Sequence, residues 1–315
     1  MRVLVTGAAG FLGQAVTAAL ARRGHEPIAL VRGDRPLPRD VVAAVRGDVR
    51  DVDAVRAAVA GVDGVCHLAA LTAVRASLTD PLPYWQTNVG GTLNVLQALT
   101  DQADRRAPPA LVLASTASVY GTPEHQPIGE DAPTLPQNPY GASKLAADHA
   151  AASVATTGAL GAISLRAFNV AGAAGGVADP DRTRLIPKIL AVQAGLAPEL
   201  VINGDGSAVR DFVHVLDMAE AFVLALGACT PGRWRAYNVG SGRRTRVLDV
   251  LHAAEQVTGR PIPIRYRPPA PEPAVLLADH TRISHDLGWA PRNSDLPTIL
   301  TDGWNALTTS YSPLE

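Results

Sequence analysis

A tyrosine and a lysine one helical turn apart, Tyr140 and Lys144, are the residues of this chain whose types and spacing most clearly suggest chemistry. The chain holds 28 lysines and arginines, and only Lys144 and Lys188 are lysine, which indicates a need that arginine does not meet. A compact ammonium can approach a phenol and a sugar hydroxyl together, which a planar guanidinium does less well. Positions i and i+4 share one helix face, and we expect the ammonium to lower the pKa of the phenol toward neutrality, as a general base requires. The alternative is a chance pair on an ordinary surface helix.

A glycine-rich turn near the amino terminus favours the first interpretation. A short apolar strand at residues 2–6 leads into Gly7-Ala-Ala-Gly10-Phe-Leu-Gly13, and a predicted helix follows over residues 11–23, ended by Gly24. Strand, glycine turn and helix in this order are typical of a dinucleotide site, because glycine lets the backbone approach a pyrophosphate and the helix N-terminus offers it N–H groups. The spacing is Gly-x-x-Gly-x-x-Gly rather than Gly-x-Gly-x-x-Gly, and a glycine-rich loop without a ligand is the alternative.

Strand-like and helix-like segments alternate through the first half of the chain. The apolar segments lie at residues 3–5, 27–31, 64–68, 110–114 and 162–165. This alternation predicts an α/β fold with a doubly wound parallel sheet and helices on both faces.

The pattern becomes irregular after residue 169. Strand-like pieces at 200–202 and 262–265 lie between helical segments, which predicts a smaller mixed α/β C-terminal domain that binds the substrate. We expect residues 1–170 to form the first domain, with a returning segment at about 211–240 that rejoins the sheet near 237–239, and residues 171–315 to form most of the second. The proline-rich residues 268–273 are expected to form a stiff loop beside the site.

Composition favours a metabolic enzyme without nucleic-acid or membrane partners. A net charge of −1 over 315 residues gives no basic footprint, and no apolar run approaches the length of a membrane span. The two cysteines, Cys66 and Cys229, make no disulfide framework, which favours the cytoplasm, and Cys66 is expected to be a buried structural thiol. His280 and His285 are five apart, a spacing that fits no usual zinc site, so no metal is predicted.

The motifs along the whole chain together resemble the extended short-chain dehydrogenases/reductases, in particular their nucleotide-sugar epimerase/dehydratase branch. In order they are Thr6–Gly13, Gly47–Val49, His67–Ala70, Asn88–Thr92, Ser115–Gly121, Pro139–Lys144, Leu165–Asn169, Arg210–His214 and Tyr237–Gly242. Any one of them is weak evidence, but their order and spacing together are highly specific. The resemblance implies a Rossmann-like fold, bound NAD or NADP, and a homodimer that pairs the helix carrying Tyr140 with the helix following Tyr84.

The resemblance also implies where the cofactor lies. Its expected contacts are Gly7, Gly10, Phe11, Leu12, Gly13, Arg32, Asp48, Val49, Leu68, Ala69, Ala70, Asn88, Tyr140 and Lys144. Family members that use NAD commonly end the second strand with an acid that binds the ribose, and this chain has Val31 there, followed by Arg32. A guanidinium suits a 2′-phosphate, which favours NADP, and an exposed Arg32 with Asp34 at the ribose is the alternative. Asp48 resembles the family's adenine contact, with a helix-capping carboxylate as the alternative.

The same resemblance implies a catalytic set of Thr116, Tyr140 and Lys144. Thr116 would bind the reacting sugar oxygen, Tyr140 would take its proton while C4 gives hydride to the nicotinamide, and Lys144 would hold the ribose. Sugar 4,6-dehydratases carry Asp-Glu after the threonine, and decarboxylases keep a glutamate where this chain has Ser118, so both reactions are disfavoured. We predict a nucleotide-diphosphate-sugar 4-epimerase that works through a 4-keto intermediate. The alternatives are an NADPH-dependent reductase of a 4-keto nucleotide sugar and a non-catalytic nucleotide-binding protein.

The expected substrate contacts are Thr72, Thr116, Ser118, Asn169, Arg210 and Arg267. Asn169 and Arg210 match residues that contact the diphosphate, although Arg210 could instead pair with Asp211 or a neighbouring acid. Pro269 stands where many epimerases hold a second diphosphate arginine, which leaves Arg267 as the nearest candidate. Thr72 stands where many galactose epimerases have lysine. These departures leave room for another sugar or base.

Overall fold

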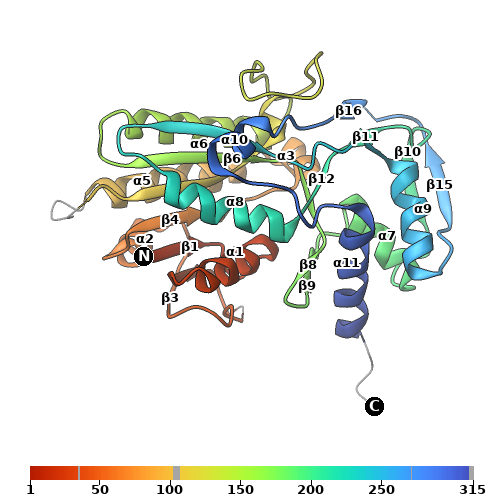
Figure 1. Cartoon of the computed structure of the whole chain (residues 1–315), viewed down its shortest axis with the longest axis horizontal. Coiled ribbons are helices and arrows are strands. Elements are labelled where there is room, and N and C mark those ends of the chain that lie inside the picture. Colours follow the sequence, from red (N-terminus) through yellow and green to blue (C-terminus); the bar gives the residue numbers. More distant parts are fainter. Residues whose placement is uncertain (35, 102–106, 271, 312–315) are drawn as a thin grey trace.

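A parallel sheet of seven strands lies at the centre of the computed structural model, which describes residues 1–34, 36–101, 107–270 and 272–311 (Figure 1). The strand order is β13-β6-β5-β4-β1-β2-β3. These strands are β1 (Arg2–Thr6), β2 (Glu26–Val31), β3 (Ala43–Arg46), β4 (Gly64–His67), β5 (Ala110–Thr116), β6 (Gly161–Ala167) and β13 (Trp234–Val239). Every neighbouring pair runs parallel, which confirms the predicted parallel sheet.

The sequence pattern predicts six of these strands, including the late return of the chain as β13, and it does not predict β3. The side chains of β3 are largely exposed at the edge of the sheet, so this strand lacks the apolar run by which a buried parallel strand is identified. The other edge strand, β13, pairs with β6 over its whole length.

Helices cover both faces of the sheet because successive strand residues point to opposite sides. Val3 and Val5 of β1 pack with α1 (Phe11–Arg22) and α8 (Val215–Ala228). Leu4, between them, packs on the other side with a second group of helices. That group is α2 (Val52–Val59), α5 (Gly91–Thr100) and α6 (Pro139–Ala155). The doubly wound arrangement is therefore confirmed.

Short helical segments lie between the longer elements. They are α3 (Val74–Thr79), α4 (Leu82–Tyr84), the π-helical η1 (Trp85–Gly90), the 3₁₀ turn η2 (Ala117–Val119) and α10 (Thr281–Leu287). η1 runs directly into α5, so the helix predicted after Tyr84 begins as a π-helical turn.

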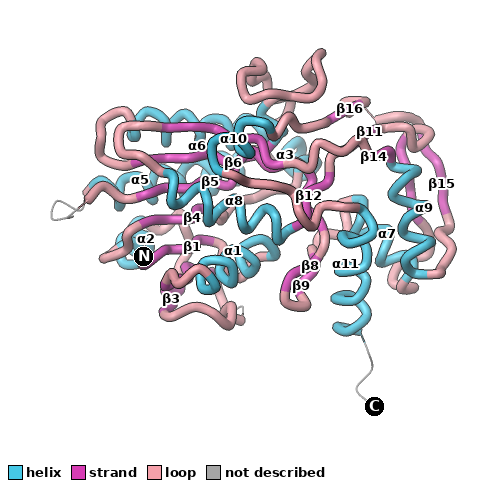
Figure 2. Tube along the Cα trace, viewed as in Figure 1, coloured by secondary structure: helices cyan, strands magenta, loops and turns pink. Residues whose placement is uncertain are grey.

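The rest of the chain builds a smaller α/β body to one side of the sheet (Figures 1 and 2). Its helices are α7 (Leu185–Gln193), α9 (Val247–Thr258) and α11 (Leu296–Tyr311), and they share one apolar core. Its strand pairs and triplet are β10 (Leu200–Asn203) with β15 (Ile264–Arg267); β7 (Asn169–Ala171) with β12 (Phe212–His214); β8 (Ala173–Ala174) with β9 (Val177–Ala178); and β14 (Thr245–Arg246), β11 (Val209–Arg210) and β16 (Val275–Leu276). The strand predicted at 262–265 begins later, at Ile264. The stiff loop predicted at 268–273 includes position 271, which lies outside the described residues.

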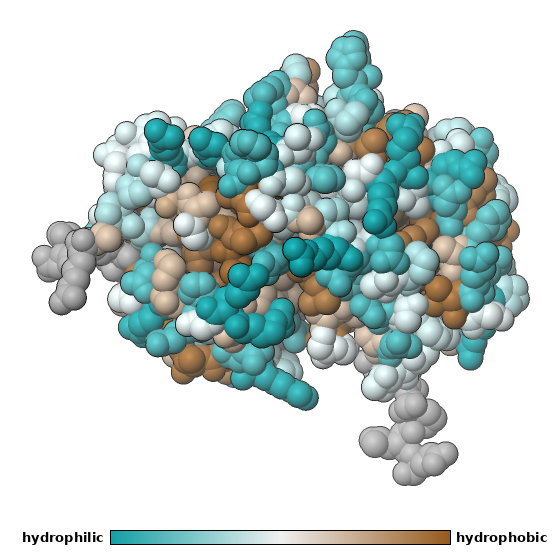
Figure 3. Space-filling view, in the orientation of Figure 1, coloured by the Kyte–Doolittle hydropathy of each residue, from teal (hydrophilic) through white to brown (hydrophobic). Residues whose placement is uncertain are grey.

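The surface and interior agree with the composition. Figure 3 shows hydrophilic residues across this face, with apolar residues in separate groups between them. Cys66 is buried in the core, and burial raises the pKa of its thiol, which confirms the expected structural role. Across the described ranges, none of the helices combines the length and apolar character needed to cross a membrane.

Candidate active site

Several of the predicted site residues lie in segments that directly follow strands of the central sheet, at its carboxyl edge, where α/β proteins bind ligands. The glycine turn follows β1, residues 68–72 follow β4, Thr116 ends β5 and Asn169 begins β7 just after β6. Gly7 has φ +70°, and a Cβ there would lie 2.9 Å from the Ala69 nitrogen. A Cβ on Gly13 would lie 2.2 Å from the Gly7 oxygen. Two of the three glycines are therefore required to keep the turn tight against the loop after β4.

A buried chain of hydrogen bonds fixes the floor of this turn. Thr6 Oγ1 accepts the N–H groups of Leu68 and Ala69, each at 3.1 Å, so its own hydroxyl proton points to His67 Nδ1 at 2.7 Å. The second ring nitrogen, Nε2, therefore carries the proton and donates to Thr92 Oγ1 at 3.2 Å. Burial lowers the pKa of His67 to about 3, with help from the charge of Lys144, so the ring is neutral.

Asn88 joins this floor to the helix that carries Tyr140. Its amide accepts the N–H of Leu71 at 2.8 Å and donates to the Leu71 carbonyl at 3.0 Å. It also donates to Ser143 Oγ at 2.9 Å, and Ser143 in turn donates to the Tyr140 carbonyl. Asn88 is buried, and its side chain aligns the loop after β4 with α6.

The start of α6 places Tyr140 against Thr116. Asn138 caps the helix by accepting the Gly141 N–H at 2.8 Å, and Pro139 occupies its first position. A Cβ on Gly141 would lie 2.6 Å from the Ser118 oxygen, so glycine is needed for α6 to approach η2 this closely. The side chain of Thr116 lies close enough to the Tyr140 phenol to lower its pKa. The predicted catalytic tyrosine and threonine therefore meet, and Lys144 lies buried one turn along the same helix.

The expectation that the pKa of Tyr140 is lowered toward neutrality is wrong for this structure. Partial burial favours the neutral phenol and raises its pKa, while the side chain of Thr116 and the charge of Arg184 act against this rise. Burial also lowers the pKa of Lys144, to about 8, and the charge of Asp148 opposes that change. The cation that opposes the rise in the pKa of the phenol is thus Arg184, which the sequence pattern does not indicate.

Cations from the smaller body and from α3 lie near the loop that follows β4. Arg184 Nη2 donates to Thr72 Oγ1 at 3.3 Å. The charges of Arg75 and Arg267 both lower the pKa of Lys188, after burial, so these three cations lie near one another. A group of cations of this kind suits a diphosphate.

Two predicted substrate residues already have protein partners. Asn169 Nδ2 donates to the Asp211 carbonyl at 2.8 Å. Arg210 donates to the Pro273 carbonyl at 2.9 Å and pairs with Glu272 at 3.2 Å, which is the alternative left open for it. Ser118 donates its N–H to Thr116 Oγ1 at 3.1 Å and so supports the catalytic hydroxyl through its backbone.

Arg32 and Asp48, two of the predicted cofactor residues, have charged groups 3.7 Å apart. Asp48 also takes a two-point contact from Arg50, at 2.9 and 3.0 Å, and this bond lowers the pKa of Asp48 to about 2. Asp51, not Asp48, caps α2, so the helix-cap alternative for Asp48 is wrong. Asp34 is fully exposed, and its partner is Arg46. The Val49 side chain is buried and packs against Gly91.

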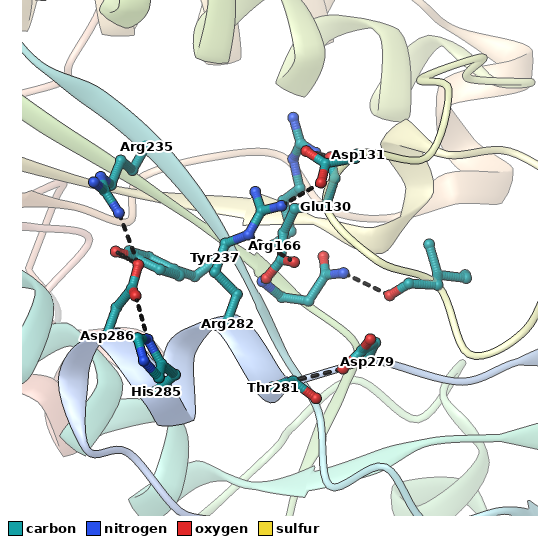
Figure 4. A network of polar contacts seen from close by, with 12 residues as sticks. Glu130, Asp131, Arg166, Arg235, Tyr237, Asp279, Thr281, Arg282, His285 and Asp286 are labelled. Carbon is teal, nitrogen blue, oxygen red and sulfur yellow. Dashed lines mark hydrogen bonds and ion pairs between the residues drawn. The ribbon is translucent and has the colours of Figure 1, made fainter.

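A second polar group lies beside β13 and α10, and Figure 4 shows its arginines facing acids. Arg235 pairs with Asp286 at 2.8 Å, Arg282 pairs with Glu130 and Asp131, and His285 bonds Asp286 at 2.9 Å. The hollow beside these residues measures about 430 Å³. Among the residues that the structure describes, no group of three or more acids, histidines and cysteines is placed to hold a metal ion. The charges here are paired with one another, so we assign this hollow no ligand.

Comparisons with known proteins agree with this geometry. Residues 3–240 match the NAD dependent epimerase/dehydratase family. UDP-glucose 4-epimerase of Corynebacterium glutamicum is 40% identical over 96% of this chain and 95% of its own length. The protein of the same name from Streptomyces lividans is 41% identical over 96% and 95%. Among solved structures, UDP-glucose-4-epimerase of Stenotrophomonas maltophila, with bound NAD and formylated UDP-arabinopyranose, has a TM-score of 0.90 at 33% identity and covers 99% of this chain and 100% of its own. The enzyme of Bifidobacterium longum, in complex with NAD⁺ and UDP, has a TM-score of 0.89 at 30% identity, with 98% of each chain covered.

Proposed function

Because this chain belongs to the NAD dependent epimerase/dehydratase family, we propose that it is an NAD-dependent 4-epimerase of a nucleotide-diphosphate sugar. The observation that carries the proposal is the meeting of Tyr140 and Thr116 at the carboxyl edge of the sheet, one helical turn from a buried Lys144. Relatives of 40 and 41% identity over nearly the whole chain are named UDP-glucose 4-epimerase, which supports the same reaction type.

The glycine turn fits a nicotinamide dinucleotide. Gly7, at positive φ, and Gly13 leave no room for a Cβ, which keeps the turn tight at the N-terminus of α1, where backbone N–H groups can bind a pyrophosphate. Residues 68–70 and Asn88 border it, and Asp48 lies farther out for the adenosine end. When bound, NAD⁺ accepts a hydride from the sugar and later returns it.

The side chains of this site then manage one proton and the orientation of the sugar. Thr116 holds the C4 hydroxyl, and Tyr140 as phenolate takes its proton while C4 is oxidised to the ketone. The keto sugar turns over, and Tyr140 returns the proton as hydride reaches the opposite face. Lys144, as ammonium, holds the ribose, and the charge of Arg184 favours the phenolate. No net oxidant is consumed, because the proton and the hydride both return to the sugar.

The substrate is proposed to be a UDP-hexose whose diphosphate lies near Arg210, Lys188 and Arg267. UDP-glucose and UDP-galactose are the first pair to test, because the relatives carry that name. Thr72 and Pro269, where many epimerases have cations, leave the identity of the sugar open. The decisive experiment incubates purified protein with UDP-galactose and no added nicotinamide, and follows UDP-glucose. Turnover that needs stoichiometric NADPH would support the reductase alternative and overturn this proposal.

A preference for NADP over NAD is a finer proposal that rests on Arg32. Its side chain is 68% exposed at the end of β2, where a guanidinium could reach a 2′-phosphate. The relevant comparison is the affinity for NAD and NADP before and after Arg32→Ala. Loss of NADP binding alone would support the preference, and equal affinities in the unchanged protein would refute it.

We also propose a homodimer and a two-part domain division. Exposed apolar residues gather on α3, α4, η1 and α5, and α6 packs against this segment. They are Val74, Leu78, Leu82, Trp85 and Leu93.

The cofactor domain comprises residues 1–170 with a return at about 211–240, and residues 171–315 mainly bind the substrate, a division that the separate apolar core of α7, α9 and α11 supports. The cytoplasmic location stays a prediction.

A further inference from the structure

Asp148 is a buried acid that the catalytic scheme above does not use. It lies one turn beyond Lys144 on α6, so Tyr140, Lys144 and Asp148 follow one another at intervals of four on one helix face. Asp148 is 1% exposed and Lys144 is 4% exposed. A carboxylate withdrawn from water to this degree is stable only with cations and hydrogen-bond donors around it.

The carboxylate of Asp148 joins α6 to the strand that carries the catalytic hydroxyl. Its Oδ2 accepts the Ser115 hydroxyl at 3.0 Å and faces Arg166 Nε at 3.4 Å. Its Oδ1 has no hydrogen-bond partner within the described part of the chain. Ser115 directly precedes Thr116 at the end of β5. The bond from Ser115 to Asp148 therefore fixes where α6 lies along β5, and with it the position of Tyr140 relative to Thr116.

Arg166 is held in place by other groups besides Asp148. Its Nη1 donates to Tyr120 Oη at 2.9 Å, and Tyr120 donates onward to Asn238 Oδ1 at 2.8 Å. Figure 4 shows Arg166 beside Glu130, whose carbonyl accepts a bond from the same guanidinium. Asp148 therefore has a fixed cation, Arg166, on one side, and Lys144 lies one helical turn before it on α6.

We propose that Asp148 is the positioning residue of this site: its charge keeps Lys144 protonated, and its bond to Ser115 sets α6 so that Tyr140 meets Thr116. The importance of a protonated Lys144 rests on the proposed function. Burial brings the pKa of Lys144 down to about 8, and the charge of Asp148 is the interaction that holds it up. Without that charge, Lys144 would lose its proton near neutral pH and could no longer act as an ammonium.

The other groups around this pair do not replace Asp148. His67, from β4, is neutral because its pKa is about 3. Burial raises the pKa of Asp148, and the charge of Arg166, from β6, opposes that rise from 3.4 Å away. Arg184, at the start of α7, acts on Tyr140. Burial raises the pKa values of Tyr120 and Tyr140, which disfavours a negative charge on either phenol.

The chain offers a direct measurement because it has two lysines. Protein made with ε-¹³C-lysine gives two Cε signals, and Lys188→Arg assigns them. In the unchanged protein with NAD added, the Lys144 signal should titrate near pH 8. Asp148→Asn should move this midpoint about one to three pH units lower. Ser115→Ala, which removes a bond to the same carboxylate but keeps its charge, is the matched control and should leave the midpoint close to that of the unchanged protein.

In Asp148→Asn, the alkaline side of the pH profile of kcat should move to lower pH together with the Lys144 midpoint. Asp148→Glu should keep both close to their values in the unchanged protein. If Asp148→Asn does not fold because Arg166 is left unpaired, Asp148→Asn/Arg166→Gln removes both charges and should show the same lowered midpoint. An unchanged Lys144 midpoint in either folded variant overturns the proposal, and so does failure of both variants to fold, since Asp148 would then serve folding alone. Should the midpoint fall as expected while Tyr140→Phe keeps full turnover, the proposed function fails and this inference stands.

Discussion

Arg184 donates a hydrogen bond of 3.3 Å to Thr72 and so ties the start of α7 to the loop that follows β4. Asp179 and Asp181 hold the same guanidinium at 2.9 and 3.3 Å. Its charge lowers the pKa of Tyr140 against the effect of burial. The smaller body thus contributes a cation that acts on the phenol proposed to take the proton of the sugar.

Replacing this cation should shift the pH dependence of turnover. Arg184→Gln removes the charge that favours the phenolate, so the pKa of Tyr140 rises and the acid side of the kcat profile moves to higher pH. For each pH unit of movement, kcat on that side should fall about tenfold. Arg23→Gln, which breaks a surface ion pair with Glu220, is the control and should leave the profile in place. An unmoved profile in Arg184→Gln would show that the cation does not act on the phenol.

Removal of the phenolic hydroxyl tests the base itself. Tyr140→Phe keeps the ring and its edge contact with Tyr84 but cannot accept the sugar proton. We expect kcat for UDP-sugar interconversion to fall on the order of 10²–10⁴-fold with bound NAD retained. Tyr266→Phe, at an exposed tyrosine of β15, should keep full activity. Turnover of Tyr140→Phe at the wild-type rate would contradict the proposed mechanism.

The local elements of the site could be predicted from sequence, whereas its tertiary partners could not. The glycine turn and the pair Tyr140 and Lys144 depend on short-range spacing, which strand and helix geometry fixes. Arg184 reaches Thr72 only because α7 folds back over the site. A local sequence pattern does not indicate that these two residues, far apart in the chain, lie close together. The rise in the pKa of Tyr140 cannot be predicted from sequence for the same reason, because the burial of its side chain depends on how all the segments at the carboxyl edge of the sheet pack.

Gly172 should be intolerant of any side chain. It has φ +87°, and a Cβ there would lie 2.4 Å from Nε2 of the buried His214. Gly172→Ala should reduce the free energy of unfolding by roughly 2–4 kcal/mol, from backbone strain and overpacking together. Gly158 has φ +83° with nothing near its Cβ position, so Gly158→Ala isolates the strain and should cost about 1–2 kcal/mol. Equal urea midpoints for the two variants would contradict the close contact.

Acid should destabilise the fold through His67. Its pKa is about 3 in the folded protein and about 6.5 when unfolded, so the unfolded chain binds the proton first as pH falls. The stabilisation is complete above pH ~6.5 and is lost toward pH 3, by up to about 1.4 kcal/mol per pH unit. Urea unfolding between pH 7 and 4.5 measures this slope. His67→Asn should flatten it, and His125→Asn, at an exposed histidine, should not.

The exposed apolar group on α3 to α5 should mediate the proposed dimer. Trp85→Glu places a charge in this surface, and we expect light scattering to report a monomer where the unchanged protein is a dimer. Leu37→Glu, at another exposed apolar residue, should leave the dimer intact. A monomer in the unchanged protein at working concentration would reject the homodimer.

Strand β13 enters the sheet long after β6, with which it pairs along its full length. A ribosome must therefore finish the intervening polypeptide before the last position in the sheet can be filled. Until residues 234–239 emerge, the nascent chain presents the backbone groups of β6 as an open template for other chains. Truncated products that stop short of Trp234 are expected to aggregate rather than accumulate as a separate nucleotide-binding half.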